Sequence, residues 1–195
     1  MRVYVVDNGG QWTHREWRVL RYLRVDTKIV PNDTPSEDLR DLDGLVLSGG
    51  APRVGIDPTK MGRNGEYLEK LDYPILGICA GHQFMAQHFG GRAAAAKVPE
   101  FGKALLTVQE PDELFMGLPK TFEVWESHND EVSALPKGFI GLASSPNCRI
   151  QAMRSLDRPL FGLQFHPEVE HTQFGKEIFQ NFLKVCEASR GSDRR

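Results

Sequence analysis

Short runs of apolar residues, each followed by a turn or a glycine-rich loop, dominate the first half of the chain. They cover residues 3–6, 44–47 and 75–78, and residues 27–30 are expected to form a further short strand. Continuous apolar runs of this length are typical of strands that are buried on both faces of a parallel sheet. After the first run, Trp17, Leu20 and Leu23 recur at helical spacing. The alternation of strands and helices therefore predicts an α/β fold, with a mostly parallel sheet and helices on both of its faces.

The second half of the chain has shorter strands in which apolar and polar residues alternate, at 104–108, 122–125, 139–143 and 150–153. Proline and glycine turns separate them, which predicts an antiparallel flank beside the parallel core. Thr172 is expected to be the N-cap of a last helix. The apolar face of that helix would be formed by Phe174, Ile178, Phe179, Phe182, Leu183 and Cys186.

The first helix has a similar start signal. Thr13 and Glu16 are three residues apart, the spacing of a capping box in which each side chain bonds a backbone N–H of the first turn. Thr13 is therefore expected to be the N-cap.

Length, charge and cysteine content limit what the chain can be. Its 195 residues suit one domain, predicted over 1–189, with a polar tail over 190–195. The net charge of −2 gives no electrostatic case for binding nucleic acid. Three widely spaced cysteines, and the lack of a signal peptide or a long apolar run, predict a cytoplasmic protein that does not enter a membrane.

A nucleophile elbow is indicated at residues 77–81, which read Gly-Ile-Cys-Ala-Gly. A sharp strand-to-helix turn crowds the backbone, so residues without a Cβ are needed beside the nucleophile. Cys79 would then lie at the start of a helix, where free amide N–H groups stabilise a thiolate. The alternative is a structural cysteine buried after a core strand. The two flanking glycines favour the nucleophile.

A base for this thiol is offered by a second apolar run, which begins at residue 160 and ends in His166-Pro167-Glu168. His166 would take the proton of the thiol, and Glu168 would orient the imidazole ring. Pro167 keeps the histidine out of a helix. The sequence therefore predicts a catalytic triad of Cys79, His166 and Glu168.

A glycine loop at residues 48–52, which reads Ser-Gly-Gly-Ala-Pro, follows the third strand. No Gly-Lys-Ser/Thr follows it, which excludes a phosphate-binding P-loop and leaves a plain turn or an oxyanion role. We expect the backbone N–H groups of Gly50 and Ala80 to form an oxyanion hole. This loop, the elbow, the histidine and residues 7–11 all follow strands, so they should meet at one edge of the sheet.

Taken together, the Gly-x-Cys-x-Gly elbow, the His-Pro-Glu segment and the glycine loop resemble the class I glutamine amidotransferases over nearly the whole chain. The resemblance implies a flavodoxin-like fold and a triad that hydrolyses glutamine to glutamate and ammonia through a thioester on Cys79. No metal site is expected, because His82 and His88 are six residues apart and do not share a helix face.

Two further segments resemble the glutaminase domains of GMP synthases. Residues 7–14 read Asp-Asn-Gly-Gly-Gln-Trp-Thr-His, and residues 126–132 read Glu-Ser-His-Asn-Asp-Glu-Val. A surface loop and a polar turn are the respective alternatives. The chain departs from familiar members at Trp12, often tyrosine, and at Ala80, often a bulkier residue. The resemblance places the substrate glutamine against Gly49, Gly50, Gln83, Ser127, His128 and Asn129, although a solvated helix position is equally open for Gln83.

The resemblance also implies a partner chain. GMP synthases continue into an ATP pyrophosphatase domain, whereas this sequence ends at Arg195. It therefore resembles the separate glutaminase subunit of a two-subunit enzyme, whose synthetase subunit would use ATP and Mg²⁺ to convert XMP to GMP. No cofactor is expected in this chain. Three alternatives remain: a glutaminase subunit for anthranilate, aminodeoxychorismate or carbamoyl phosphate synthesis, a stand-alone γ-glutamyl hydrolase or cysteine peptidase, and a regulatory domain without activity, which the complete triad disfavours.

Overall fold

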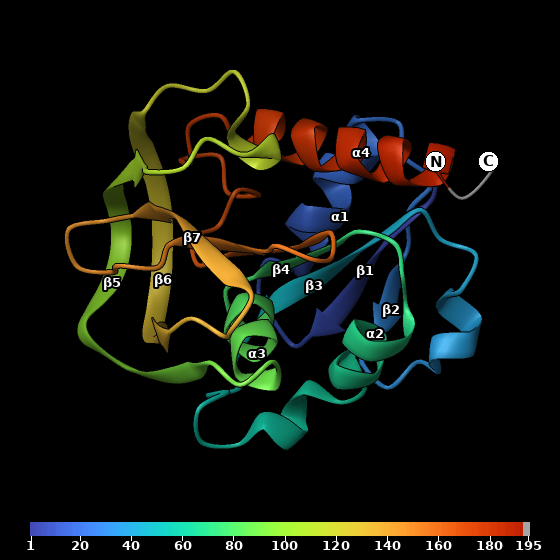
Figure 1. The fold of residues 1–195 in the computed structure, drawn as a ribbon, viewed down its shortest axis with the longest axis horizontal. Helices are drawn as coiled ribbons and strands as arrows, with labels where there is room; N and C mark the ends of the chain where they lie inside the picture. Colours follow the sequence, from blue (N-terminus) through green and yellow to red (C-terminus); the bar gives the residue numbers. More distant parts are fainter. Residues whose placement is uncertain (193–195) are drawn as a thin grey trace.

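A twisted mixed sheet forms the centre of the molecule (Figure 1), a computed structural model that describes residues 1–192. Within these residues the sheet has nine strands in the order β2-β1-β3-β4-β9-β8-β7-β5-β6. The first five strands in this order run parallel, and β8, β7, β5 and β6 continue the sheet as antiparallel neighbours. The strand bounds are β1 (Val3–Asn8), β2 (Ile29–Pro31), β3 (Gly44–Gly50), β4 (Ile75–Ile78), β5 (Arg92–Val108), β6 (Thr121–Ala134), β7 (Phe139–Ser144), β8 (Ala152–Ser155) and β9 (Leu160–Leu163).

Helices cover both faces of the parallel part (Figure 1). They are α1 (Thr13–Tyr22), α2 (Asn64–Lys70), α3 (Ala80–His88) and α4 (Gly175–Ser192), with short 3₁₀ turns at Ser36–Leu39, Pro58–Met61 and Glu113–Phe115. Successive residues of a strand point to opposite faces, so Val5 packs with α1 and α4 whereas Val6 packs with α2 and α3. The predicted α/β fold with helices on both faces is confirmed.

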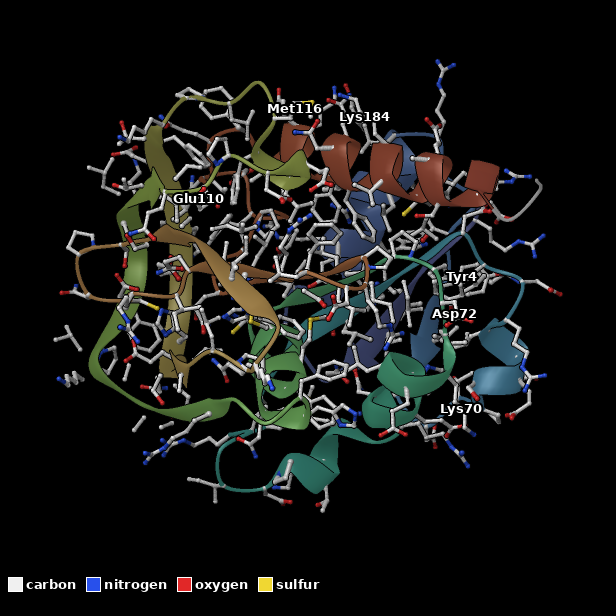
Figure 2. The ribbon with its side chains drawn as sticks, in the orientation of Figure 1. Tyr4, Lys70, Asp72, Glu110, Met116 and Lys184 are labelled. Atoms are coloured by element: carbon white, nitrogen blue, oxygen red, sulfur yellow. The ribbon has the colours of Figure 1, made fainter. Side chains whose placement is uncertain are left out.

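The outer face of α4 is polar, as the amphipathic pattern requires. Lys184 is exposed on it, and Met116, which follows the neighbouring 3₁₀ turn, lies beside it (Figure 2). Phe179, Phe182 and Cys186 on the opposite face are fully buried against the sheet. This is the apolar face that the sequence predicts, except that Phe174 precedes α4 and is 37% exposed.

The antiparallel flank is confirmed, but two of its strands are much longer than the alternating pattern indicates. β5 has 17 residues and β6 has 14, and the two pair along most of their length. Residues 126–132 belong to β6, so they do not form the polar turn that the sequence left open. In this stretch the inward positions hold Glu126, His128 and Asp130, and polar residues at inward positions hide the apolar alternation by which strands are recognised.

The two predicted caps are wrong, because both threonines bond to other parts of the chain. Thr13 lies inside α1, and its hydroxyl oxygen Oγ1 is 3.1 Å from both Asp7 Oδ1 and the Gly10 carbonyl. Thr172 precedes α4 by three residues, and its hydroxyl donates to the His166 carbonyl at 2.6 Å. Both side chains therefore hold loops that belong to the candidate site.

The polar tail that the sequence predicts over residues 190–195 begins inside a helix. Arg190, the first residue of the predicted tail, lies in α4, and its Nε is 3.5 Å from Oδ1 of Asp43. Residues 193–195 of that predicted tail lie outside the described residues. Within residues 1–192, no helix is long and apolar enough to cross a membrane.

Removing the ring of Phe182 should test the packing of α4 on the sheet. We expect Phe182→Ala to lower the free energy of unfolding by about 3–5 kcal/mol, because a fully buried ring leaves a cavity. Urea unfolding measures this change. Gln180→Ala, on the exposed face of the same helix, is the control and should stay within about 0.5 kcal/mol of the parent. Equal stabilities of the two variants would contradict the described packing.

Candidate active site

The turn from β4 into α3 holds Cys79 in a backbone conformation that L-residues rarely adopt. Its φ is 48° and its ψ is −103°, and a residue other than glycine is held there only by its surroundings. Two glycines make the turn possible. A Cβ on Gly77 would lie 2.7 Å from the Gly81 carbonyl carbon, and a Cβ on Gly81 would collide with the Leu47 carbonyl oxygen. The local geometry is that of a nucleophile elbow.

The thiol of Cys79 lies where α3 begins. Because Ala80 is the first residue of that helix, the amide N–H groups of its first turn have no partners within the helix and lie next to the cysteine. The sulfur is 3.6 Å from Nε2 of Gln164 and 4.0 Å from the Ser127 carbonyl oxygen. Cys79 is only 7% exposed. It is reachable, but little of it meets bulk water.

His166 and Glu168 form a fixed pair beside the elbow. Nδ1 of His166 is 2.6 Å from Oε1 of Glu168. The backbone of His166 is held at both ends, since its N–H donates to the Trp125 carbonyl at 3.0 Å and its carbonyl accepts from Thr172. The ring of Trp12 packs edge-on against the imidazole, with 4.5 Å between ring centroids. The imidazole therefore has little freedom to turn away.

The electrostatics of this pair favour a charged imidazole. Burial alone would lower the pKa of His166, but the charge of Glu168 and a hydrogen bond with Cys79 raise it well above its ordinary value. Gly49 lies between the two side chains: a Cβ on it would be 3.2 Å from His166 Cε1 and 3.5 Å from Cys79 Cβ. The raised pKa of His166 therefore favours a protonated imidazole next to the side chain of Cys79.

Two hollows open on Cys79 from different sides. The first, of about 270 Å³, is lined by residues 9–13, Glu16, the glycine loop, His166 and Glu168. Four segments that follow strands thus meet at one edge of the sheet, as the sequence predicts. The second hollow, of about 180 Å³, is lined by Gly50, Ala80, Gln83 and residues 127–130. A larger hollow of about 600 Å³ lies at the opposite edge of the sheet, away from Cys79.

The predicted glutamine-binding residues are brought together, but in different ways. Gly49 lines the first hollow and Asn129, with an exposed side chain, lines the second, whereas Gly50 and Ser127 line both. Gln83 is 3% exposed, and its Nε2 donates to the Asp130 carbonyl at 2.7 Å. The solvated position that the sequence left open for Gln83 is therefore wrong. The side chain of His128 is only 1% exposed, so it is the main chain of this residue that can meet a substrate.

Glu16 also lies at the site, although its sequence pattern predicts only a role in capping α1. It is 1% exposed, lines the first hollow, and its Oε1 accepts a hydrogen bond from the Gly49 N–H at 3.3 Å. Burial, followed by the charge of Glu168, raises its pKa well above the ordinary value. A signal was available, because Thr13, Glu16 and Leu20 share the buried face of α1. A carboxyl group on the apolar side of an amphipathic helix is uncommon.

The two histidines of α3 occupy places that suit packing and surface roles. His82 is fully buried, and burial lowers its pKa to about 3. His88 lies at the end of the helix, with its Nε2 3.2 Å from Oε1 of Glu69. The two side chains do not share a cluster of potential metal ligands in the described part of the chain.

Comparisons with known proteins agree with this geometry. Residues 4–186 match the family described as glutamine amidotransferase class-I. The glutamine-hydrolyzing GMP synthase subunit of Thermoplasma volcanium is 56% identical, over 96% of this chain and 93% of the relative. The corresponding protein of Archaeoglobus fulgidus is 47% identical, over 95% of this chain and 99% of the relative.

Solved structures show the same fold. A crystal structure of a candidate GMP synthase subunit from Thermoplasma acidophilum superposes with a TM-score of 0.96 at 54% identity, covering 100% of this chain and 98% of that one. A glutamine amidotransferase from Methylobacillus flagellatus shares the fold at 18% identity, with a TM-score of 0.75 and 94% of each chain covered. With the family match covering residues 4–186, the chain belongs to the class I glutamine amidotransferase family.

Proposed function

We propose that this chain is the glutamine-hydrolysing subunit of a two-subunit GMP synthase. The observation that carries the chemistry is the strained elbow at Cys79 beside the buried His166–Glu168 pair. The choice of GMP synthesis is supported by relatives of that name, which are 44–56% identical over nearly their whole length. GMP synthesis uses a nucleotide that is dissolved in the cytoplasm, so we propose a cytoplasmic location.

The chemistry follows from the thiolate and the imidazolium. The Cys79 thiolate attacks the side-chain amide carbon of glutamine and forms a tetrahedral intermediate. When the C–N bond breaks, the leaving nitrogen takes a proton from His166 and departs as ammonia. His166, now neutral, accepts a proton from water, and the resulting hydroxide attacks the thioester. The C–S bond then breaks, which releases glutamate and restores the thiolate and the imidazolium.

Each tetrahedral intermediate places negative charge on an oxygen, which needs fixed donors. We assign this role to the backbone N–H groups of Gly50 and Ala80, which line the same hollow as Cys79. Loss of one such donor typically costs about 3 kcal/mol of transition-state stabilisation. The hydrogen bond from Gly49 to Glu16 supports the role, because it holds the loop against α1.

Glutamine would bind with its amide at Cys79 and its amino-acid end toward residues 127–129. This direction is supported by the second hollow, in which Ala80, Gln83 and the 127–129 segment surround one space next to the sulfur. Gln83 holds the Asp130 carbonyl and so fixes the end of that segment. The side chain of Asn129 is exposed at this hollow and is free to meet the substrate.

The ammonia is delivered to a separate synthetase subunit, which supplies ATP and Mg²⁺ chemistry to XMP. No cofactor is assigned to this chain. Ammonia that escapes into water is lost to the synthetase, so we propose that the free glutaminase is slow and that docking of the synthetase activates it. A steady-state rate for the free chain as high as that in the complex with nucleotide would contradict this coupling.

Mixing this chain with a candidate synthetase tests the proposed function. With XMP, ATP and glutamine we expect GMP, and with Cys79→Ala we expect glutamine-dependent GMP formation to fall to background. Added ammonia should restore GMP formation in the mutant mixture, because the synthetase itself is intact. GMP formed from ammonia but never from glutamine would assign the glutaminase to another acceptor, such as one of the other amidotransferase pathways. Full glutaminase activity of the free chain would favour a stand-alone hydrolase.

Replacing Glu168 should lower kcat without removing the nucleophile. Glu168→Gln keeps the shape of the side chain but not the charge that orients and charges His166, so we expect kcat for glutamine hydrolysis to fall by about 10²–10⁴-fold. KM should change little, since Glu168 does not line the hollow proposed for glutamine. Steady-state kinetics measure both values. An unchanged kcat would remove Glu168 from the triad.

Replacing Glu16 should change the pH dependence of stability. Its folded-state pKa is raised, so its contribution to stability is largest below its ordinary pKa and falls as the pH rises toward the folded value. Glu16→Gln replaces the carboxyl group with an amide that does not ionise, so the variant does not lose this stability as the pH rises. We expect the variant to be more stable than the parent at pH 8, with the difference shrinking toward pH 4.5, as measured by urea unfolding. Glu177→Gln, an exposed change on α4, is the control and should show no such trend.

A further inference from the structure

Three buried ionisable side chains meet on one side of the antiparallel flank, outside the triad. They are Glu100 of β5 and Glu126 and His128 of β6, which are 5%, 1% and 3% exposed. Glu100 pairs directly with His128 across the two strands, and Glu126 lies two residues from His128 on the same strand face. One ligand atom from each residue lies within 4.8 Å of the other two.

The distances fit a metal ion held between these atoms. Nε2 of His128 is 3.0 Å from Oε2 of Glu100 and 3.3 Å from Oε2 of Glu126. Zinc binds imidazole nitrogen and carboxylate oxygen at about 2.0–2.2 Å. Ligands at that radius, spaced at tetrahedral or octahedral angles, are about 3.0–3.5 Å apart. The side chains would need little movement to accept the ion.

The hydrogen bonds around the cluster orient its ligand atoms inward. Nδ1 of His128 is 2.9 Å from the Asp130 carbonyl, so Nδ1 carries the proton and the Nε2 lone pair faces the carboxylates when the ring is neutral. Glu100 accepts hydrogen bonds from Ser145 at 2.7 Å and from Gln151 at 2.8 Å. A backbone carbonyl behind the histidine and donors behind the carboxylate are the usual supports of metal ligands.

Glu126 supplies the observation that points to a missing cation. Both of its carboxylate oxygens are buried; within the described residues Oε1 has no partner, and the one close contact of Oε2 is Nε2 of His128 at 3.3 Å. In the same residues, the only ion-pair partner of Glu100 or Glu126 is His128. If both carboxylates are ionised, one imidazolium leaves one buried negative charge uncompensated, which is costly. A divalent cation with a neutral imidazole brings the cluster to zero net charge.

We propose that Glu100, Glu126 and His128 bind one divalent transition-metal ion, with water as a further ligand. Zinc suits a set of one imidazole and two carboxylates, and Mn²⁺ is the alternative for the same donors. A hollow of about 320 Å³ lined by Glu100 and Glu126 offers an entry path and room for the water. This proposal does not depend on the proposed function.

The ion would act on the catalytic site through β6. Ser127 lies between two of the ligands, and its carbonyl oxygen is 4.0 Å from the sulfur of Cys79. An ion that ties β5 to β6 at this point would fix the segment that lines the second hollow. The ion would position that segment, because Ser127 joins two of the ligands along β6 and its carbonyl oxygen faces the thiol.

Metal binding should be measured in Cys79→Ala, since the thiol is itself a strong zinc ligand. Titration calorimetry with ZnCl₂ and with MnCl₂, together with elemental analysis after dialysis, should give about one ion per chain. Glu126→Gln in this background should weaken binding at least about tenfold. Glu123→Gln removes a carboxylate at a partly exposed position of β6 and should bind as the parent does. No binding, or equal binding by the Glu126→Gln protein, would overturn the proposal.

A second measurement does not depend on the folding of the Glu126→Gln protein. Crystals of Cys79→Ala grown with ZnCl₂ should show an anomalous difference peak at the zinc edge, bounded by Glu100, Glu126 and His128. A peak at other sites alone, or no peak, would show that the cluster is a hydrogen-bonded acid–imidazole group without a metal.

Discussion

The site depends on one backbone constraint, the left-handed conformation of Cys79. A φ of 48° aims the thiol out of the turn and leaves it beside the first amide N–H groups of α3. This conformation persists only because the surroundings leave no alternative. β4 is buried between β3 and β9, and α3 packs so closely on β3 that Gly81 has no room for a Cβ. The central sheet therefore holds Cys79 in this conformation.

Burial and contacts with neighbouring groups together set the pKa values of the ionisable side chains at the site. Glu168 and the thiol hydrogen bond raise the pKa of His166 and keep it protonated against the effect of burial. The same burial, with Glu168 nearby, raises the pKa of Glu16. A protonated Glu16 can hold the Gly49 loop without adding a second negative charge beside Glu168. The raised pKa of Glu16 favours its neutral form, in which it supports the loop while Glu168 carries the charge that faces the imidazole.

Hydroxyl groups connect the segments that meet at this edge of the sheet. Thr172 joins the His166 loop to β6, since its Oγ1 donates to the His166 carbonyl and accepts from the Trp125 N–H. Ser48 joins β3 to β1 through a 3.0 Å hydrogen bond from the Asn8 N–H. The first link holds the loop of His166 on β6, and the second holds the end of β3, which leads into the glycine loop, on β1. They also explain why the threonines that look like helix caps are used elsewhere.

The parallel core, the elbow at Cys79 and the pairing of His166 with Glu168 could all be predicted from the amino-acid sequence. Each of these depends on local features: an apolar run, a glycine on either side of a turn, and a proline that stiffens a dipeptide. The order of strands and loops also sufficed to bring four segments to one edge, because parallel strands end on the same side.

The positions of Glu16 and His128 depend on contacts between residues that are distant in the sequence. Glu16 faces the triad because α1 packs on the sheet with its carboxyl inward, whereas the local pattern reads as a capping box. His128 turns from the predicted glutamine site toward Glu100, a residue 28 positions away that only the pairing of β5 with β6 brings near. The local sequence encodes the backbone conformation and the face of a helix or strand on which each side chain lies. Which polar groups meet inside the fold is set by packing, so it could be known only from the assembled molecule.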